Sequence, residues 1–371
     1  MRICHLGDSH LGAGANHPRR GASGLTLRQE DIIAAFAEAV DKVIALRPDV
    51  CIHAGDLFDA VRPLNRVMAA AGELLHRLAE EAGIPTVLIS GNHDAPKQPH
   101  VGAPIDVYRQ IDNLYIASAG RREVFRIGEA AVHALPHCLT GPILQEELAQ
   151  CRPEASARYN VFVGHGVVAG MPEFAMADLG EQEIEVGKLE GFDYIALGHY
   201  HNNCEVGKRA WYCGSTERLS QAEREAEKGF LEVVLDPFEV RFHRVHARPM
   251  VDIPPIDATG KRGDQLAEMI RAQVTAAGAE DKIIRVRVEG VTEETLKTMP
   301  SDVLMELKQQ SWALDLTFQK AKAEGAGEAF GRAAIGRLDQ EFLRFLESTE
   351  IRGFDRDRLR EMGLAYLAEE E

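Results

Sequence analysis

Five short polar clusters follow apolar runs in the 371-residue chain, and a glycine opens each cluster. The clusters contain two carboxylates, four imidazoles and one amide that could bind metal: Asp8, His10, Asp56, Asn92, His165, His199 and His201. Seven ligands of mixed nitrogen and oxygen type are too many for one closed tetrahedral zinc site, but they suit two metals that share a bridging carboxylate. Two metals about 3.5–4 Å apart stabilise the attacking and leaving oxygens of a displacement at phosphorus. The residue types therefore predict phosphoester hydrolysis.

The spacing within the clusters supports this interpretation. Asp8 and His10 are two residues apart, as are His199 and His201, so in extended backbone the two side chains of each pair point the same way. The preceding glycine lets the chain turn sharply and lets backbone approach closely. A single Gly-Asp or Gly-His pair carries no information, but five clusters with one design favour a common site.

The elements that must position these clusters alternate between strands and helices in the first half of the chain. Apolar runs and stretches of helical periodicity follow one another in the order 2–6, 27–46, 49–54, 67–78 and 85–90. This pattern predicts an α/β fold with a parallel or mixed sheet, which binds ligands at the carboxyl ends of its strands. From about Leu114 shorter strand-like runs predict a β-rich half packed on the first. Histidines inside strand-like runs (His5, His53 and His133) are expected to be buried structural residues.

The composition changes after residue 248. Pro249, Pro254 and Pro255 indicate a boundary. Beyond it, alternating helical and strand patterns predict a small α+β module at 249–320, and 321–328 is typical of a flexible linker. Two apolar stripes at helical spacing in 329–371 predict two amphipathic helices, which either pack on their own domain or bind a partner.

The chain carries 58 acidic and 42 basic residues, a formal charge of −16. This charge excludes a uniformly basic nucleic-acid-binding face. It does not exclude a nucleic-acid substrate, because divalent metals and local arginines can bind phosphate on an acidic protein. It predicts weak, strongly salt-sensitive DNA binding by the chain alone. The sequence contains no run of 18 apolar residues and no signal-type segment, so we expect no membrane association and a cytoplasmic location.

The ordered set D-x-H, GD-x₂-D, GNHD, GH and GH-x-H resembles the calcineurin-like metallophosphoesterase superfamily. Within it, "GDLFDAVRP", "GNHDAPKQ" and "YCGSTERLSQAEREAEKGF" are similar to the SbcD-type nuclease subunit of the double-strand-break repair complex. The resemblance covers about residues 1–320. It implies a four-layer α/β/β/α sandwich at 1–248, a DNA-capping α+β domain at 249–320 and a C-terminal helical tail.

The resemblance also implies how the metals are held. One metal, expected to be manganese, would be bound by Asp8, His10, Asp56 and His201. The second would be bound by Asp56, Asn92, His165 and His199, so that Asp56 bridges the two. A hydroxide between the metals would attack the phosphodiester.

We expect two further residues to take part in catalysis. His93 matches the family's general acid, which protonates the departing sugar oxygen. Asp59 stands where archaeal and eukaryotic members usually have histidine, whereas the Ser/Thr phosphatase branch also has aspartate there. We hypothesise that Asp59 accepts a hydrogen bond from His93 and keeps it protonated. On this hypothesis Asp59→Asn lowers turnover and leaves metal content intact.

The resemblance implies a manganese-dependent DNA phosphodiesterase, both exonuclease and endonuclease, acting in break repair. It further implies a homodimer and an SMC-like ATPase partner of SbcC type, bound by 329–371. One alternative is a phosphatase or small phosphodiester hydrolase of the same superfamily, and another is a scaffold subunit of an ATPase assembly. The capping module and the "GSTER…KGF" stretch favour the nuclease, and a scaffold needs neither seven ligands nor His93.

Overall fold

The computed structural model describes residues 1–98, 100–168 and 182–320, together with residues 342, 343, 346, 356–360 and 364, which are helical. The predicted linker at 321–328 and most of the predicted helix-loop-helix at 329–371 lie outside the described residues. The chain divides into two compact units, Met1–Gln319 and Lys320–Glu371. All elements named below belong to the first unit, apart from the last residue of β17.

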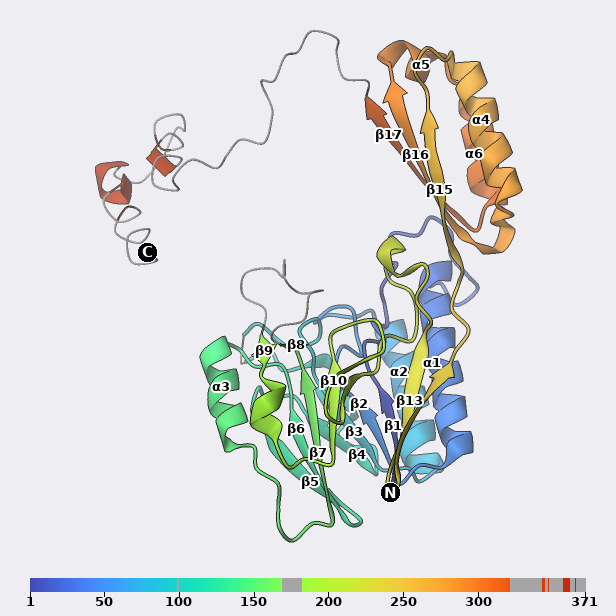
Figure 1. The fold of residues 1–371 in the computed structure, drawn as a ribbon. Coiled ribbons are helices and arrows are strands. Elements are labelled where there is room, and N and C mark those ends of the chain that lie inside the picture. The colour runs from blue at the N-terminus through green and yellow to red at the C-terminus, as the bar shows by residue number, and fades with distance from the viewer. Residues whose placement is uncertain are drawn as a thin grey trace. The chain divides into compact units, whose positions relative to one another are not determined.

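The first sheet has six strands in the order β14-β13-β1-β2-β3-β4. Its strands are β1 (Arg2–Leu6), β2 (Val50–His53), β3 (Thr86–Ile89), β4 (Leu114–Ala117), β13 (Gly229–Leu235) and β14 (Phe238–Arg244). The first four are parallel to one another, and β13 pairs antiparallel with β1 and β14. Helices α1 (Leu27–Leu46) and α2 (Asn65–His76), with a π-helical turn at Arg77–Glu81, cover one face (Figure 1).

The second sheet also has six strands, in the order β11-β12-β10-β7-β6-β5. Its strands are β5 (Glu123–Ile127), β6 (Ala130–Leu135), β7 (Tyr159–His165), β10 (Tyr194–Gly198), β11 (Cys204–Gly207) and β12 (Ala210–Tyr212). Strands β6, β7, β10 and β12 are parallel. Helix α3 (Gly141–Gln150) and a 3₁₀ turn at Val186–Leu189 pack on the outer face, with Leu144 and Leu148 of α3 buried there.

The two sheets face each other across a shared apolar core. Ile52 and Val87 of the first sheet belong to the same buried cluster as Val132 and Val163 of the second. A separate buried cluster, which includes Phe36, lies between the first sheet and its helices. The predicted four-layer α/β/β/α sandwich is confirmed. Helix α3 was not among the predicted elements.

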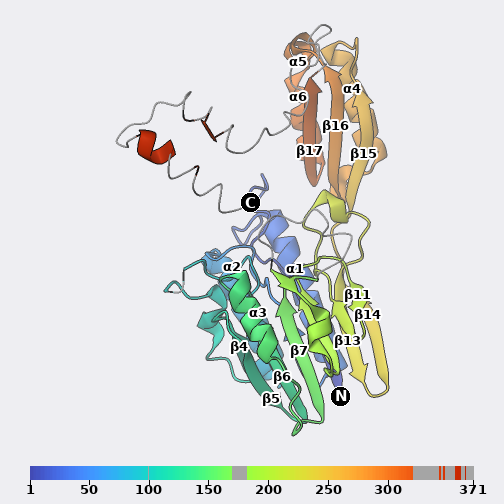
Figure 2. The same ribbon diagram turned by 60° about the vertical axis from the view of Figure 1, so that its left-hand side comes forward.

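The stretch after residue 248 forms a three-stranded sheet in the order β15-β16-β17, with helices on one face (Figures 1 and 2). Its elements are β15 (Met250–Asp257), α4 (Gly263–Ala276), β16 (Ile283–Val291), α5 (Glu293–Thr298), α6 (Ser301–Gln310) and β17 (Ala313–Lys320). It has its own buried core, around Ile270, Val286 and Leu307. Its assignment as a separate domain at 249–320 stays a prediction.

The prolines that indicated a boundary are not all in a connecting segment. Pro254 and Pro255 lie inside β15, where the pairing register with β16 shifts between Ile253 and Ile256. Proline lacks an N–H donor, so it is tolerated on edge strands and at such irregularities. Two of the three prolines that indicated the boundary thus lie within the first strand that follows it, and the boundary itself stays a prediction.

The remaining elements are short. Strands β8 (Val167–Val168) and β9 (Glu183–Ile184) pair with each other, and 3₁₀ turns occupy Pro104–Tyr108, Gln221–Glu223 and Ala279–Asp281. Within the described residues, no helix combines the length and the apolar character needed to cross a membrane.

Candidate metal centre

The seven predicted ligands all lie at the carboxyl ends of strands, and they come from both sheets. In the first sheet, Asp8 and His10 follow β1, Asp56 follows β2 and Asn92 follows β3. In the second sheet, the remaining three lie at the ends of β7 and β10: His165, His199 and His201. Hydrogen bonds join the two groups of loops, because the His199 N–H donates to both oxygens of Asp8, at 2.9 and 3.0 Å. The structure thus brings the seven side chains to one edge of the sandwich.

Four of these residues have unusual backbone conformations. The φ angles of Asp8, His10, Asp56 and His199 are 50°, 44°, 53° and 106°, in the region that glycine normally occupies. Each such residue costs about 1–3 kcal/mol and persists where its surroundings fix it. Part of this fixing is direct, since the His10 N–H donates to the Asp56 carbonyl at 3.0 Å. Strain concentrated at four ligand positions is typical of a functional site.

Two glycines allow the loops to approach this closely. A Cβ atom on Gly91 would lie 2.2 Å from Asp56 Oδ1, and one on Gly198 would lie 2.1 Å from the Ala54 carbonyl oxygen. Any other residue at these positions would push the loops apart. Gly91 and Gly198, which open two of the clusters, are therefore required by contact between loops.

One group of ligand atoms is formed by Asp8, His10 and His201, whose donor atoms all lie within 4.8 Å of one another. The Nε2 atoms of His10 and His201 are 3.2 Å apart, and Asp56 Oδ2 is 3.6 Å from His10 Nε2. Metal–ligand bonds of about 2.1 Å place neighbouring ligand atoms about 3.0–3.4 Å apart. The spacing of the two imidazole nitrogens fits a shared cation.

A second group gathers around His165. Its Nδ1 donates to the Ala54 carbonyl at 2.8 Å, which directs Nε2 toward Asn92 Oδ1 at 2.9 Å and Asp56 Oδ2 at 3.3 Å. His199 Nδ1 lies 3.1 Å from the same Asn92 oxygen. Asp56 therefore lies between the two groups, as a bridging carboxylate must.

Burial and mutual interaction shift the pKa values of several groups in the site. Burial raises the pKa of Asp8 above its ordinary value. Burial acts on Asp56 in the same direction, but the neighbouring His165 outweighs it and holds the pKa of Asp56 well below its usual range. Burial disfavours a charged His165 ring, yet Asp56 and Asp8 raise its pKa to about 9. Burial lowers the pKa of His199 to about 3, so this ring is neutral. Two buried carboxylates with imidazole neighbours match the ligand chemistry of divalent cations.

His93 differs from the predicted ligands because its side chain is 44% exposed. Its N–H donates to Asp56 Oδ1 at 2.8 Å, which fixes the residue beside the ligands. Its Nδ1 donates to the backbone carbonyl of Asp59 at 3.1 Å, whereas the Asp59 carboxylate is 3.9 Å away. The same carboxylate lies 3.3 Å from Nδ1 of His10. The expected hydrogen bond from His93 to the Asp59 carboxylate is replaced by one to its main chain.

This geometry changes the expected result for Asp59→Asn. Because the carboxylate is nearest to the ligand His10, we expect the substitution to weaken metal binding at that site by up to about tenfold, as second-layer contacts to metal-bound histidines do. The expected loss of metal affinity is at the low end of the range for such contacts because the Asp59 side chain is 41% exposed. Calorimetric titration with Mn²⁺ measures the change. Unaltered affinity would restore the original hypothesis, in which Asp59 acts on His93 alone.

Asp94 is a residue of the site to which the sequence assigned no role. Its buried carboxylate accepts hydrogen bonds from the N–H groups of Gly91 at 2.7 Å, Leu57 at 2.9 Å and Phe58 at 3.3 Å. Burial, together with the charge of Asp56, raises the pKa of Asp94 to about 8. Asp94 thereby ties the loop after β2 to the loop after β3. The sequence feature that could have identified Asp94 as a site residue is its position in the GNHD cluster.

We expect Asp94→Asn to destabilise the fold by about 1–3 kcal/mol, because the amide cannot accept all three hydrogen bonds and turns an N–H toward a backbone donor. Urea unfolding of the metal-free protein at a pH above 8, where the Asp94 carboxyl is ionised, measures the difference. Asp112→Asn, a change on an exposed loop, is the matched control. Equal stability of the two variants would contradict the bracing role.

A cavity of about 820 Å³ opens beside the candidate ligand Asn92. Lys97 and Arg121 supply positive charge to its lining, and His137 and Leu139 also line it. Burial lowers the pKa of His137 to about 4, so its ring is neutral. The site thus adjoins a space that combines cationic and apolar groups.

A family model described as calcineurin-like phosphoesterase matches residues 1–203, which is more than half of the chain. The chain belongs to the calcineurin-like phosphoesterase family, and the resemblance drawn from its motifs is confirmed.

Individual relatives point to a narrower group. A protein named DNA double-strand break repair protein Mre11 from Haloferax volcanii is 29% identical over 294 residues, 78% of this chain and 61% of that protein. Its namesake from Saccharolobus solfataricus is 30% identical over 237 residues, 62% and 58% of the two chains. The SbcD component of the nuclease SbcCD from Staphylococcus epidermidis is 24% identical over 257 residues, 62% and 65%. The match spans about three fifths of the length of these relatives.

Proposed function

We propose that this chain is a manganese-dependent DNA phosphodiesterase that acts as exonuclease and endonuclease in double-strand-break repair. The observation that carries the proposal is the convergence of seven ligand side chains from two sheets beside one exposed histidine, His93. The names of the relatives, which refer to break repair and to a nuclease, support DNA as the substrate. The adjoining cavity of about 820 Å³ offers room for part of a nucleotide chain.

The ligand geometry supports two cation positions. Asp8, His10, Asp56 and His201 would hold one cation, and Asp56, Asn92, His165 and His199 the other. When bound, the cations would supply Lewis acidity that activates an attacking water and neutralises phosphate charge. The carboxylate and amide oxygens among these ligands are the donors that suit manganese.

His93 is the residue that we assign to proton transfer. Its Nδ1–H is held by the Asp59 carbonyl, which leaves Nε2 of the protonated ring to deliver a proton to the departing sugar oxygen. Its ring and that of His10 are in edge contact, with centroids 4.6 Å apart. The acid therefore stands beside the ligands without being buried among them.

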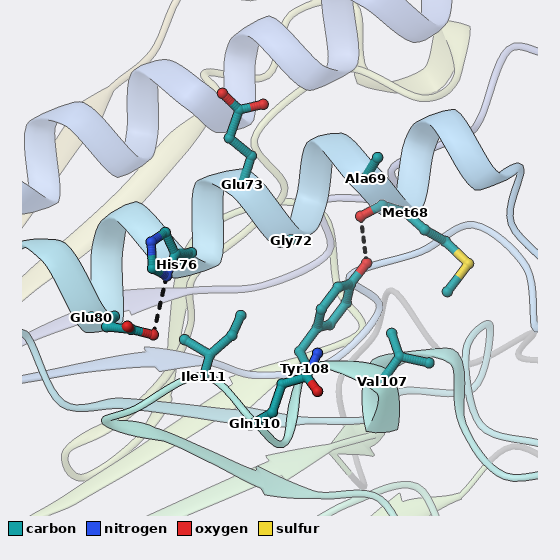
Figure 3. A pocket seen from close by; sticks show the side chains of 10 residues that line it. All are labelled: Met68, Ala69, Gly72, Glu73, His76, Glu80, Val107, Tyr108, Gln110 and Ile111. Carbon is teal, nitrogen blue, oxygen red and sulfur yellow. Dashed lines mark hydrogen bonds and ion pairs between the residues drawn. The ribbon is translucent and has the colours of Figure 1, made fainter.

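A homodimer and an SMC-like ATPase partner of SbcC type complete the proposal, with a cytoplasmic location. For the dimer, the support is an apolar surface at α2 and the 3₁₀ turn at Pro104–Tyr108, where Leu64 and Val107 are 52% and 51% exposed. A hollow of about 590 Å³ lies beside Val107, and Figure 3 shows Tyr108 directed at α2, its hydroxyl donating to the Met68 carbonyl at 2.6 Å. Light scattering of the full chain measures the mass.

Nuclease activity on end-labelled duplex DNA with added Mn²⁺ tests the proposal. We expect the wild type to release nucleotides, the chelated protein to be inactive, and His93→Ala to be strongly impaired. A small chromogenic phosphodiester is assayed in parallel. Hydrolysis of that compound without any cleavage of DNA would favour the alternative, a small phosphodiester hydrolase. Inactivity on both with metal bound would favour the scaffold.

A further inference from the structure

A buried ion pair lies behind the candidate ligand His201, and the proposed chemistry does not use it. Lys228 and Glu223 belong to the "GSTERLSQAEREAEKGF" stretch that distinguished the nuclease branch in the sequence. Lys228 Nζ lies 2.5 Å from Glu223 Oε2, and the side chains are 0% and 10% exposed. Removing two charges from water is costly unless they are paired and hydrogen-bonded. The position of the pair beside the metal centre calls for an explanation.

Both residues of the pair contact His201, but at different parts of it. The Glu223 carboxylate accepts from the His201 ring, with Oε1 3.1 Å from Nδ1. Lys228 Nζ donates to the main-chain carbonyl of His201 at 3.0 Å. The pair therefore fixes the ring and the backbone of one residue together. The opposite ring atom, Nε2, faces Nε2 of His10 at 3.2 Å.

Every other contact of the Glu223 carboxylate also holds it in place. Ser220 Oγ donates to Oε1 at 3.1 Å, and the Leu219 N–H donates to Oε2 at 3.2 Å. Lys228 is held in turn by Ser215 Oγ at 2.8 Å, and the Ser215 N–H donates to the His201 carbonyl at 3.1 Å. The glycine-serine end and the lysine end of the motif thus meet at one histidine.

We propose that Glu223 and Lys228 are positioning residues that orient His201 for metal binding and strengthen its metal bond. A histidine whose Nδ1–H is held by a carboxylate keeps its lone pair at Nε2 and becomes a more basic ligand. The candidate ligand His165 is oriented by a neutral carbonyl instead, that of Ala54. The two cation positions are therefore unequal, and the pair acts on the one that contains His201. This inference rests on the proposed metal centre.

Calorimetric titration of the full chain with Mn²⁺ tests the inference. The wild type should bind two ions. Glu223→Ala should weaken one of the two binding events about 10- to 100-fold and leave the other unchanged. Glu223→Gln keeps an oxygen opposite Nδ1, so its loss should be smaller than that of Glu223→Ala. A larger loss of Mn²⁺ affinity in the Ala variant than in the Gln variant distinguishes a positioning role from a merely structural one.

Glu232→Gln is the matched control. Glu232 is similarly buried, at 7%, and accepts from a histidine, His243 Nε2 at 2.8 Å, which is not a candidate ligand. Its Mn²⁺ affinities should equal those of the wild type. Wild-type affinity at both sites in Glu223→Ala would overturn the inference, as would equal losses in the Ala and Gln variants. A wild type that binds no Mn²⁺ would instead contradict the metal centre itself.

If Glu223→Ala does not fold, the double variant Glu223→Gln with Lys228→Met replaces it. This variant removes both charges at once, so no buried charge is left unpaired. Its thermal unfolding midpoint should stay close to that of the wild type. One Mn²⁺ site should still weaken relative to Glu232→Gln, and its retention at wild-type affinity would overturn the inference.

Discussion

Asp56→Asn is expected to remove bound metal and to lower phosphodiester hydrolysis on the order of a thousandfold or more, about 4 kcal/mol of transition-state stabilisation. Asp56 lies between both groups of ligand atoms, with Oδ2 3.3 Å from His165 Nε2 and 3.6 Å from His10 Nε2. A neutral amide cannot bridge two cations as a carboxylate does. Metal content after gel filtration and turnover with Mn²⁺ are the two measurements.

Asparagine at this position should preserve the local backbone conformation. It tolerates the left-handed backbone that Asp56 adopts at φ 53°, and its amide oxygen can still accept from the His93 N–H. Asp49→Asn is the control, because Asp49 precedes the amino end of the same strand, where it accepts from the Arg2 N–H at 2.7 Å. Retention of two metals and normal turnover in Asp56→Asn would remove the central support for the proposed function.

His93→Ala is expected to lower turnover about 10²- to 10⁴-fold, the usual contribution of a general acid, while both metals stay bound. The side chain is exposed, and it contacts the Asp59 carbonyl, the Asp59 carboxylate at 3.9 Å and the edge of His10. We therefore expect its removal to leave the ligand loops in place. Single-turnover cleavage of end-labelled DNA measures the rate, and calorimetry measures the metal.

His246→Ala is the control, since His246 is also exposed and lies beyond the end of β14, away from the candidate ligands in the sequence. Its turnover and metal content should equal those of the wild type. A substrate whose leaving group needs no protonation should be cleaved by His93→Ala at nearly the wild-type rate. If that substrate shows the full loss, His93 has a role other than proton donation.

The fold was predictable where local pattern and local chemistry agree. Helix α1 occupies Leu27–Leu46 as its periodicity predicts, because Thr26 and Gln29 form a capping box that fixes its start. The ligands could be identified because polar clusters that follow strands in an α/β fold lie at the same edge of the sheet. This inference does not require the loop conformations to be known. Helix α3 was missed because two buried leucines in a short segment give little periodicity.

The sequence predicted which residues belong to the site better than it predicted which side chains contact one another. Whether Asp59 reaches His93 or His10 depends on the path of the loop after β2, and residue spacing contains no such information. Asp94 and Glu223 act through partners that only the folded loops bring near. Glu223 lies 22 residues from His201 in the sequence, so no local pattern could connect them.

The division of the ligands between two sheets has a consequence for protein synthesis. Strands β1 to β3 emerge from the ribosome first and carry only part of the ligand set, while His165, His199 and His201 come later. A nascent or truncated chain that ends before residue 201 cannot assemble the centre. On the proposed function, cleavage of DNA would therefore begin only after both halves of the sandwich have been made and have docked.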